Sequence, residues 1–533
     1  MKFLKIFVLL FIVLPFWSCE DTSLQPTQEK LNILFLFSDD HAVQAIGAYG
    51  SKINKTPNLD RIADKGVVFM NSFCANSICG PSRACILTGK HSHKNGFKQN
   101  GDQFDGSQVT FPKLLKKAGY ETAIIGKWHL KSQPTGFDYW EVLVGQGKYY
   151  NPDFITTTAT EENPNHYEGY CTTIVTDLTL EWLKNKRDPS KPFMLMCQHK
   201  APHRNWAPDI KYLTKYDDVD IPEPATLFDN WENRSVTLKA NEMSIKEDFQ
   251  YEHDMVFHED MPAELISKRP TNLPAHIKKM GNGEYSRMTD EQKKAWDAAF
   301  QPKNDKFLKN IPTGKALIRW KYQRYIKNYL RCIDSVDENI GRVLDYLEEN
   351  DLMKNTIVIY SSDQGFYLGE HGWFDKRWMY EESLKMPLIV SWPGLTKPGT
   401  KNTQHLIQNI DYNPTFLDIA GVKVPKDIQG QSFKSILENP NAPWRESIYY
   451  HYYENPGWHN VARHEGVRGK RYKLINFYDD DGYNLHDLKK DPLEMKDVSK
   501  DPAYAYIMKK MKLELAQARK QYNLPPLQKR KKN

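Results

Sequence analysis

The chain has 533 residues, which is enough for a large buried core and indicates two domains. Its formal net charge is only +6, with 73 basic and 67 acidic residues interspersed along the sequence, so we expect no binding to nucleic acid. The basic run at 529–532 is expected to be part of a solvated tail. The seven cysteines are odd in number and scattered, which argues against a disulfide framework or a zinc site.

Residues 1–18 have the pattern of an export signal, in which Lys2 and Lys5 precede an apolar run too short to span a membrane. A small residue and Cys19 follow at once and resemble a bacterial lipoprotein processing site. This predicts a lipidated Cys19, a linker at 19–30, and export to the periplasm or outer-membrane surface of a Gram-negative bacterium. Membrane contact would then be made only through the lipid. Cleavage to a soluble periplasmic protein is the alternative.

The most specific pattern lies at residues 77–89, with Cys-Gly-Pro-Ser-Arg from Cys79 to Arg83 at its centre. Pro81 suits the first turn of a helix, because its missing N–H is not needed there. Cys79 should therefore lie near a helix N-terminus, where the dipole and free N–H groups favour an anion. Arg83, one turn later, can neutralise an oxyanion. A buried structural cysteine beside a proline turn is the alternative.

The segment from Cys79 to Gly89 contains the complete pattern Cys-x-Pro-Ser-Arg-x-x-x-Leu-Thr-Gly. It resembles the signature of the type I sulfatases of the alkaline-phosphatase-like superfamily, in which the cysteine is oxidised to formylglycine (3-oxoalanine) after synthesis. The resemblance extends in the family's order over about residues 31–500. It implies that the protein hydrolyses a sulfate ester and that a separate sulfatase-maturing enzyme acts on Cys79.

Residues 31–37 are a continuous apolar run, typical of a buried parallel strand, and lead directly to Asp39 and Asp40. Adjacent carboxylates are unfavourable unless a cation neutralises them, and hard oxygen ligands suit Ca²⁺ or Mg²⁺. For this pair alone, a helix cap beside a solvated acid is the alternative. By resemblance, one Ca²⁺ is held at five positions: Asp39, Asp40, Cys79, Asp363 and Gln364. Gln364 stands where the family more commonly has Asn, and its carbonyl oxygen can still bind a hard cation.

Further motif residues follow other predicted strands. The predicted strand at 121–125 runs into Gly-Lys-Trp-His, which contains Lys127 and His129. The resemblance implies that Lys127 and a second lysine, Lys376, hold sulfate oxygens. It also implies that His129 contacts the formylglycine and that His203, after a later strand, is the general acid.

The predicted elements indicate an α/β fold. With the resemblance, they imply a large mixed, mostly parallel central sheet flanked by helices, of the alkaline-phosphatase-like type, over residues 31–440. Residues 208–312 are rich in charge and proline and are expected to be an insertion over the core. Residues 441–525 are expected to form a smaller C-terminal subdomain of antiparallel sheet and helix. A basic tail follows at 526–533.

Several elements are predicted by their periodicity. Helices are expected at 176–186 and 504–522, and at 316–352 as one long helix or two. In the C-terminal subdomain, 447–453 and 466–478 are expected to be antiparallel strands.

The resemblance also implies a mechanism. The formylglycine formed from Cys79 hydrates to a diol, one hydroxyl of which attacks sulfur in line, while His203 protonates the leaving sugar oxygen. The metal, Arg83 and the two lysines stabilise the developing oxygen charge. His129 then helps to remove the second diol proton, which expels sulfate and restores the aldehyde.

The segments 201–204 and 453–468 resemble those of Bacteroidetes N-acetylglucosamine-6-sulfatases and mucin-desulfating sulfatases. This predicts exo-acting removal of the 6-O-sulfate from N-acetylglucosamine at the non-reducing end of glycosaminoglycan (heparin or heparan sulfate) or mucin fragments. A 2-O-sulfatase acting on uronate, and a galactose or N-acetylgalactosamine sulfatase, are alternatives. The candidate substrate-binding residues are His371, Asp375, Arg377, His459, His464 and Arg468. Of these, His371 is expected to support the site rather than to catalyse.

Two alternatives belong to other classes. A phosphatase or phosphodiesterase of the same superfamily would use Ser or Thr with two transition metals, and the intact Cys-x-Pro-Ser-Arg argues against it. A non-catalytic glycan-binding lipoprotein would be expected to have lost at least one motif, and none is lost.

Overall fold

The computed structural model describes residues 30–257, 283–479 and 482–530. The predicted export signal, the lipidation site Cys19 and nearly all of the predicted linker lie outside the described residues, as does the end of the basic tail. Within the three ranges, no helix combines the length and the apolar character needed to cross a membrane. The cysteines in these ranges are free and buried.

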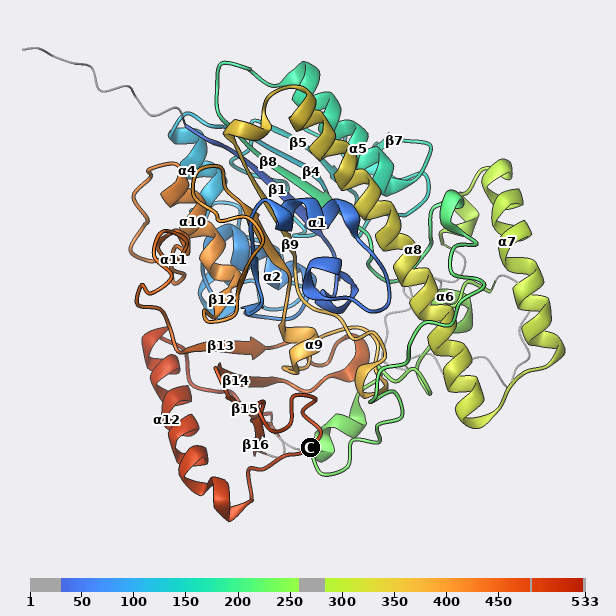
Figure 1. Ribbon diagram of the computed structural model, residues 1–533, viewed down its shortest axis with the longest axis vertical. Coiled ribbons are helices and arrows are strands. Elements are labelled where there is room, and N and C mark those ends of the chain that lie inside the picture. The colour runs from blue at the N-terminus through green and yellow to red at the C-terminus, as the bar shows by residue number, and fades with distance from the viewer. Residues whose placement is uncertain (1–29, 258–282, 480–481, 531–533) are drawn as a thin grey trace, which may run out of the picture. The chain divides into compact units, whose positions relative to one another are not determined.

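Ten strands of the described residues form one large sheet, in the order β11-β2-β10-β9-β1-β8-β4-β5-β6-β7 (Figure 1). Its centre is parallel, because β1 pairs in parallel with both β8 and β9, and β4 pairs in parallel with β8 and β5. Only β10 and β6 run antiparallel to both of their neighbours in the described sheet. The strands are β1 Asn32–Ser38, β2 Val67–Phe69, β4 Glu121–Gly126, β5 Tyr139–Leu143, β6 Asp153–Ile155, β7 Asn165–His166, β8 Phe193–His199, β9 Thr356–Ser362, β10 Leu388–Ser391 and β11 Thr400–Asn402. The predicted mixed, mostly parallel sheet is confirmed.

Helices flank this sheet, and a two-stranded ladder of β3 (Ser72–Phe73) and β12 (Ile407–Gln408) lies beside it. The helices are α1 Pro57–Asp64, α2 Cys79–Thr88, α3 Ser92–Asn95, α4 Phe111–Lys117, α5 Cys171–Glu181, α6 Tyr251–Asp254, α7 Asp290–Lys309, α8 Gly314–Glu349, α9 Glu381–Leu384, α10 Tyr412–Ile419, α11 Lys434–Glu438 and α12 Ala505–Gln521. The helix predicted at 316–352 is a single element, α8. The helix predicted at 176–186 begins earlier, at Cys171, and passes into a π-helical turn at Trp182–Lys186.

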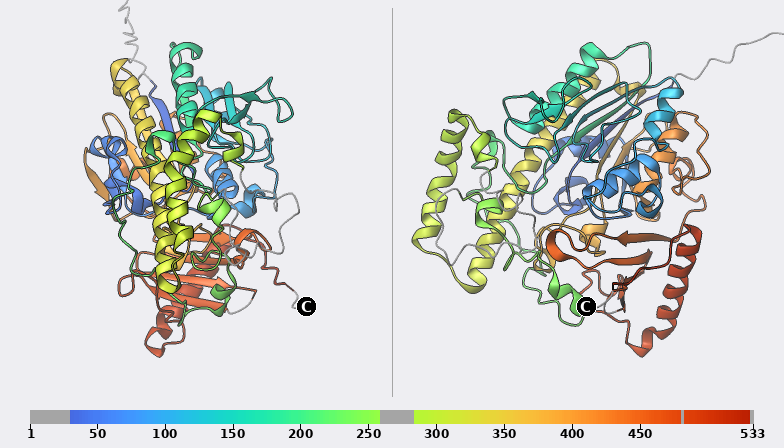
Figure 2. Two further views of the ribbon diagram at one scale, coloured as in Figure 1. Left: turned by 90° about the vertical axis from the view of Figure 1, so that its right-hand side faces the viewer. Right: turned by 180° about the vertical axis from the view of Figure 1, so that it is seen from behind.

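The central strand β1 packs on both faces, because successive side chains of a strand point to opposite sides. Leu34 and Leu36 belong to a core shared with α1, α5 and α8. Ile33, Phe35 and Phe37 belong to a second core shared with α2, α4 and α10. Figure 1 shows the first helix group in front of the sheet, and the rear view in Figure 2 shows α2 and α4 on the other side. This double covering explains the uninterrupted apolar sequence of β1.

The region 208–312 contributes α6 and α7 beside α8, at the right of Figure 1. Helix α7 was not predicted, although its start carries a readable signal. Thr289 accepts from the backbone N–H of Gln292, and the Gln292 side chain accepts from the backbone N–H of Thr289. This capping box marks a helix start even in a charged sequence whose apolar periodicity is weak.

The C-terminal subdomain is a four-stranded antiparallel sheet, as far as the residues are described, with α12 packed on it. Its strands are β13 Ser447–Tyr452, β14 His464–Gly469, β15 Tyr472–Phe477 and β16 Gly482–Asp487. The segment predicted as one strand at 466–478 is two strands, because the chain turns between Gly469 and Tyr472 and pairs with itself. Strand β16 was not predicted. The predicted subdomain of antiparallel sheet and helix is confirmed.

Candidate active site

The strand ends of the large sheet bring distant motifs together. Asp39 and Asp40 follow β1, Lys127 follows β4, His203 follows β8, and Asp363 follows β9. These four strands are mutually parallel, so their carboxyl ends lie at one edge of the sheet, where open α/β sheets bind ligands. The sheet topology therefore brings motifs that are far apart in the sequence together in a single site.

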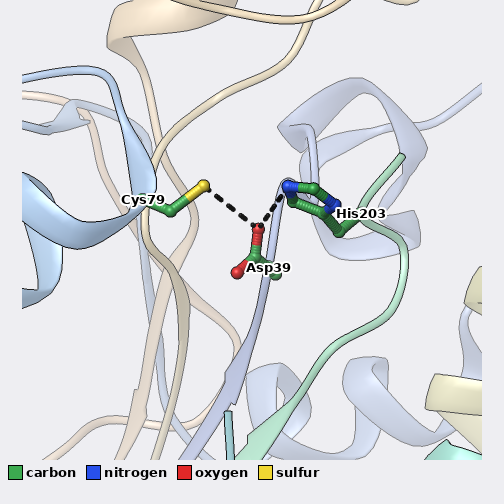
Figure 3. Close-up of side chains that lie close together, drawn as sticks. All are labelled: Asp39, Cys79 and His203. Carbon is green, nitrogen blue, oxygen red and sulfur yellow. Dashed lines mark hydrogen bonds and ion pairs between the residues drawn. The ribbon is translucent and has the colours of Figure 1, made fainter. Parts of the chain in front are cut away.

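Helix α2 delivers Cys79 to this edge. Ile78 caps the helix in an extended conformation, Cys79 is the first helical residue, and Pro81 lies in the first turn, where it needs no N–H partner. The Cys79 thiol donates to Asp39 Oδ1 at 3.6 Å. His203 Nε2 lies 4.0 Å from the same oxygen and 3.8 Å from Asp40 Oδ2. Figure 3 shows Cys79 and His203 converging on Asp39 from opposite sides.

Three cations neutralise the carboxylates of the site. Arg83 Nη2 lies 2.7 Å from Asp39 Oδ2 and 3.2 Å from Asp363 Oδ2. Lys127 Nζ is 2.5 Å from Asp39 Oδ2, and Lys376 Nζ is 2.7 Å from both oxygens of Asp40. We call this group the strand-end cluster, and it comprises Asp39, Asp40, Cys79, Arg83, Lys127, His203, Asp363, Gln364 and Lys376. Its charged side chains are buried, so their interactions are weakly screened by water.

The electrostatics of the strand-end cluster favour a cation in addition to these three. Burial, only partly offset by Lys376, raises the pKa of Asp40 to about 7. Burial together with Asp39 raises the pKa of Asp363 to about 6, while Lys127 and Arg83 overcome burial and hold the pKa of Asp39 well below its usual value. The negative charge of two carboxylates is therefore disfavoured in this site, and a further positive charge would stabilise it.

The ligand atoms present fit a hard divalent cation. One carboxylate oxygen each from Asp39, Asp40 and Asp363 lies within 4.8 Å of the others. The side-chain oxygen of Gln364 is buried and has no hydrogen-bond partner among the described residues. Oxygen donors of this kind suit Ca²⁺ or Mg²⁺. The four side chains predicted as oxygen ligands are thus together in one place.

The environment of the two predicted histidines favours their neutral form. Burial and Lys127 lower the pKa of both His129 and His203 well below the usual value. His129 is half-buried and follows Lys127 by two residues, and its buried Nδ1 has no partner among the described residues. An anion bound between the lysines would reverse the electrostatic balance and favour the protonated form of His203.

Several site residues have a backbone conformation that favours glycine. The φ angles are 62° at Asp40, 55° at His129, 71° at Asp375, 97° at Arg377 and 66° at His459. Non-glycine residues rarely adopt such angles, and strained backbone of this kind concentrates where side-chain direction matters more than stability. Sequence patterns did not predict these conformations.

A second group of charged side chains adjoins the first, and we call it the loop cluster. Asp375 and Arg377 flank Lys376, and Arg377 Nε donates to Asp375 Oδ1 at 3.0 Å. His459 Nε2 lies 3.2 Å from Asp375 Oδ2 and 3.2 Å from Arg204 Nη1. The full set is Arg204, Asp254, Asp375, Arg377, Glu454 and His459. It joins the insertion, the 375–377 loop and the C-terminal subdomain.

Three members of the loop cluster were not predicted as site residues. Arg204 pairs with the buried Asp254 through two hydrogen bonds of 2.6 and 2.8 Å. Glu454 lies 3.2 Å from Arg377 Nη1. Arg204 and Glu454 stand in segments that the sequence singled out, but no spacing rule identifies a residue whose partner is about 50 or more positions away. No sequence pattern around Asp254 indicates a site residue.

The other three candidate substrate residues have different partners. His371 is buried between Asp229 and Glu382, at 3.1 and 3.6 Å. Arg468 pairs with Glu381 at 2.9 Å, and His464 packs among aromatic rings with its Nδ1 2.8 Å from the Ala462 carbonyl. None of the three makes a polar contact with either cluster among the described residues.

Comparisons with known protein families identify the family of the chain. The sequence model of the family described as Sulfatase matches residues 31–422, and a model described as N-sulphoglucosamine sulphohydrolase, C-terminal, matches residues 369–521. The chain therefore belongs to the sulfatase family. It is a sulfuric ester hydrolase with the alkaline-phosphatase-like fold that the sequence predicted.

Individual relatives are similar over nearly the whole chain. An N-acetylglucosamine-6-O-sulfatase of Bacteroides thetaiotaomicron is 46% identical, over 95% of this chain and 89% of that protein. An arylsulfatase of Clostridium perfringens is 26% identical, over 89% of this chain and 91% of that protein. Among solved structures, one determined in complex with its substrate, D-glucosamine-2-N,6-O-disulfate, has a TM-score of 0.86 and 45% identity. That match covers 93% of this chain and 98% of the other.

The fold alone does not select the reaction. A phosphonate monoester hydrolase from Silicibacter pomeroyi has a TM-score of 0.67 at 20% identity, covering 92% of this chain and 96% of that chain. At that identity the similarity concerns the fold only. The family match and the residues of the strand-end cluster carry the assignment to the sulfatases.

Proposed function

We propose that this sulfatase removes the 6-O-sulfate from N-acetylglucosamine at the non-reducing end of glycosaminoglycan or mucin fragments. The observation that carries the proposal is the 46% identity, over 95% of the chain, to a protein named for that activity. The substrate of the similar solved structure is a single sugar that bears a 6-O-sulfate, which supports action on a terminal residue. A sulfated saccharide is therefore the substrate class.

The strand-end cluster supplies the sulfate-binding chemistry in this proposal. Lys127 contacts Asp39 and Lys376 contacts Asp40, so a sulfate bound beside these two carboxylates would meet two ammonium groups. Arg83 is held by both Asp39 and Asp363 and adds fixed positive charge without having to move. His203, at the more open side of the cluster, is placed to protonate a leaving oxygen. We assign the second proton transfer to His129, which follows Lys127 by two residues.

We propose Ca²⁺ as the metal and formylglycine at position 79 as the nucleophilic residue. Asp39, Asp40, Asp363 and the Gln364 oxygen would hold the ion, which would supply charge stabilisation at the sulfate oxygens when bound. Burial and Asp39 raise the pKa of the Cys79 thiol, so the unmodified side chain is a poor nucleophile. This supports conversion of Cys79 by a maturing enzyme.

The loop cluster supplies the contacts to the sugar in this proposal. Asp375 and Arg377 flank the sulfate-binding Lys376 in the chain, so a sugar attached to the sulfate would meet them first. Together with His459 they offer donors and acceptors suited to sugar hydroxyls. We assign sugar binding to these three, whereas the contacts of His371, His464 and Arg468 account for their burial.

We also propose export of the chain with Cys19 as a lipid attachment site, which rests on the N-terminal sequence pattern alone. Metabolic labelling with a fatty-acid analogue tests this, with a Cys19→Ser variant as control. Label in the wild-type chain that is absent from the variant is the expected result. Unlabelled, secreted protein would favour the soluble alternative.

A matched panel of sulfated sugars tests the substrate. It comprises N-acetylglucosamine-6-sulfate, galactose-6-sulfate, N-acetylgalactosamine-6-sulfate and a 2-O-sulfated uronate disaccharide, with conversion of Cys79 verified by peptide mass. Activity confined to the first compound is expected. Turnover of another member would discard the proposed substrate and retain the reaction. If protein with verified Cys79 conversion hydrolysed none of the four compounds and no aryl sulfate, both the proposed substrate and the proposed site chemistry would be contradicted.

A further inference from the structure

Glu454 is a buried carboxylate with two partners on different parts of the chain. Its Oε1 accepts from Arg377 Nη1 at 3.2 Å, and its Oε2 accepts from the backbone N–H of Asn100 at 2.9 Å. Glu454 lies after β13 in the C-terminal subdomain, whereas Asn100 lies in the loop after α3. A single side chain therefore connects the 375–377 loop to a loop of the central domain.

The connection continues to the residue beside the nucleophile. Asn100 Oδ1 accepts from the backbone N–H of Gly80 at 3.1 Å. A Cβ at position 80 would lie 2.7 Å from the Phe97 ring and 3.0 Å from Asn100 Oδ1, so only glycine allows this close approach. The polar chain thus runs from Arg377 through Glu454 and Asn100 to the first turn of α2, which carries Cys79.

The Glu454 side chain has little freedom to leave this position. A Cβ at Gly457 would lie 2.6 Å from Glu454 Cγ, so the Glu454 side chain packs directly against the backbone three residues later. On the other side, Arg377 has a φ of 97° and is restrained by the Tyr452 hydroxyl at 3.1 Å from Nη1. The Tyr450 hydroxyl donates to the Arg377 carbonyl at 2.6 Å. A strained arginine needs such partners to keep one orientation.

We infer that Glu454 is a positioning residue, which orients the Arg377 guanidinium toward the sugar and fixes it relative to the turn that carries the nucleophile. The inference rests on the proposed role of Arg377 in sugar binding. A purely structural ion pair would have no link to the site. Glu465 in the same subdomain is such a case, because all its polar partners among the described residues lie outside both clusters, namely Arg519, Tyr449, His451 and Asn476.

Kinetics on two substrates separate positioning from structural support. We expect Glu454→Gln to lower kcat/KM for N-acetylglucosamine-6-sulfate by about tenfold to a hundredfold, mainly through KM, because a charge-assisted hydrogen bond is lost. The loss on a small aryl sulfate, which has no sugar hydroxyls, should be clearly smaller. Adding Glu454→Gln to Arg377→Ala should cause little further loss on the sugar, since both act through one guanidinium. Glu465→Gln is the matched control, with little effect on either substrate.

Equal losses on both substrates, additive effects in the double variant, or no loss at all would overturn the inference. Thermal unfolding of each variant verifies folding, and Glu454→Asp provides a second variant that keeps the charge but is too short to reach both partners. It should raise KM for the sugar by at least threefold. If the wild type turned over the aryl sulfate but not the sugar, the proposed substrate would fail and the inference with it. If the wild type acted on the sugar and both Glu454 variants matched it, only the inference would fail.

Discussion

The two adjoining clusters of the site are built in different ways. The strand-end cluster takes Asp39, Lys127 and Asp363 from the ends of parallel strands, where backbone hydrogen bonds hold each residue in register. The loop cluster takes Arg377, Glu454 and His459 from connecting segments, which hold one another mainly through side-chain contacts. The proposed chemistry thus rests on the sheet, while the proposed sugar recognition rests on loops that can vary without disturbing the sheet.

This difference has a testable consequence. Substitutions in the strand-end cluster should affect every sulfate ester, because they act on the group common to all substrates. Substitutions in the loop cluster should affect sugar substrates and spare aryl sulfates, because they act on the part of the substrate that differs.

The largest effect is expected for Cys79→Ala. Loss of the proposed nucleophilic residue should lower kcat by about 10⁴-fold or more on sugar and aryl sulfates alike. Binding of the sugar, measured by calorimetry on the inactive protein, should persist because the loop cluster is intact. Residual turnover by verified Cys79→Ala protein would mean that another residue is the nucleophile.

Removal of the proposed cation should have the second-largest effect on activity. Chelation, or Asp40→Asn, is expected to lower kcat on both substrates by about 10²-fold or more, and Ca²⁺ should restore the chelated wild type but not the variant. Metal analysis of the purified protein identifies the ion. Glu446→Gln, at an exposed carboxylate paired with Lys470, is the control. Full activity in the metal-free protein would contradict the proposed ion site.

Arg377→Ala tests the loop cluster directly. The variant should raise KM for N-acetylglucosamine-6-sulfate by about tenfold to a hundredfold, because the proposed charged donor to the sugar is removed. The effect on an aryl sulfate should be several-fold smaller. An equal loss on both substrates would mean that Arg377 serves the sulfate and not the sugar, and would break the division between the clusters.

Arg204→Lys should have a smaller effect of the same kind. Lysine keeps the charge but cannot make both hydrogen bonds to Asp254 or reach His459 in the same way. We expect KM for the sugar to rise by about threefold to tenfold, with His459 less well oriented. Arg463→Lys breaks a similar double contact to Asp479 outside the clusters and is the matched control. Similar kinetics for both variants would mean that Arg204 has no role in sugar binding.

The smallest kinetic effect is expected for His371→Gln, which should act on stability. Burial opposes the charge of His371, but Asp229 and Glu382 override it and raise its pKa to about 9, with Arg234 opposing them. Because this pKa is above the unfolded value of about 6.5, the stabilisation is fully present below that pH and is lost as pH rises through 9. The wild type should unfold several degrees above the variant at pH 6, and the difference should shrink by pH 10. A constant difference would mean that His371 stays neutral.

Much of the strand-end cluster could be predicted because its residues follow strong strand patterns or complete motifs. Asp39 and Asp40 directly follow an apolar run, and the segment at Cys79 contains a full signature. The C-terminal strands were harder, because only the short sequence Gly-Lys-Arg at 469–471 marks the turn between β14 and β15, and β16 has few apolar residues. Helix α7 was missed because its capping box, and not its periodicity, marks its start.

The amino-acid sequence by itself determined the sulfatase chemistry, the α/β core and the candidate ligands Asp39, Asp40, Asp363 and Gln364, because each is local to a strand end or a motif. Only the tertiary structure decided which charged residues join the loop cluster. Arg468 and Glu454 are both charged residues of the C-terminal subdomain, and the sequence does not show which of them belongs to the site. Arg468 pairs with Glu381 away from the site, whereas Glu454 pairs with Arg377 within it. The physical reason is that these contacts depend on how loops pack across long sequence separations, whereas strand ends are fixed by regular backbone pairing.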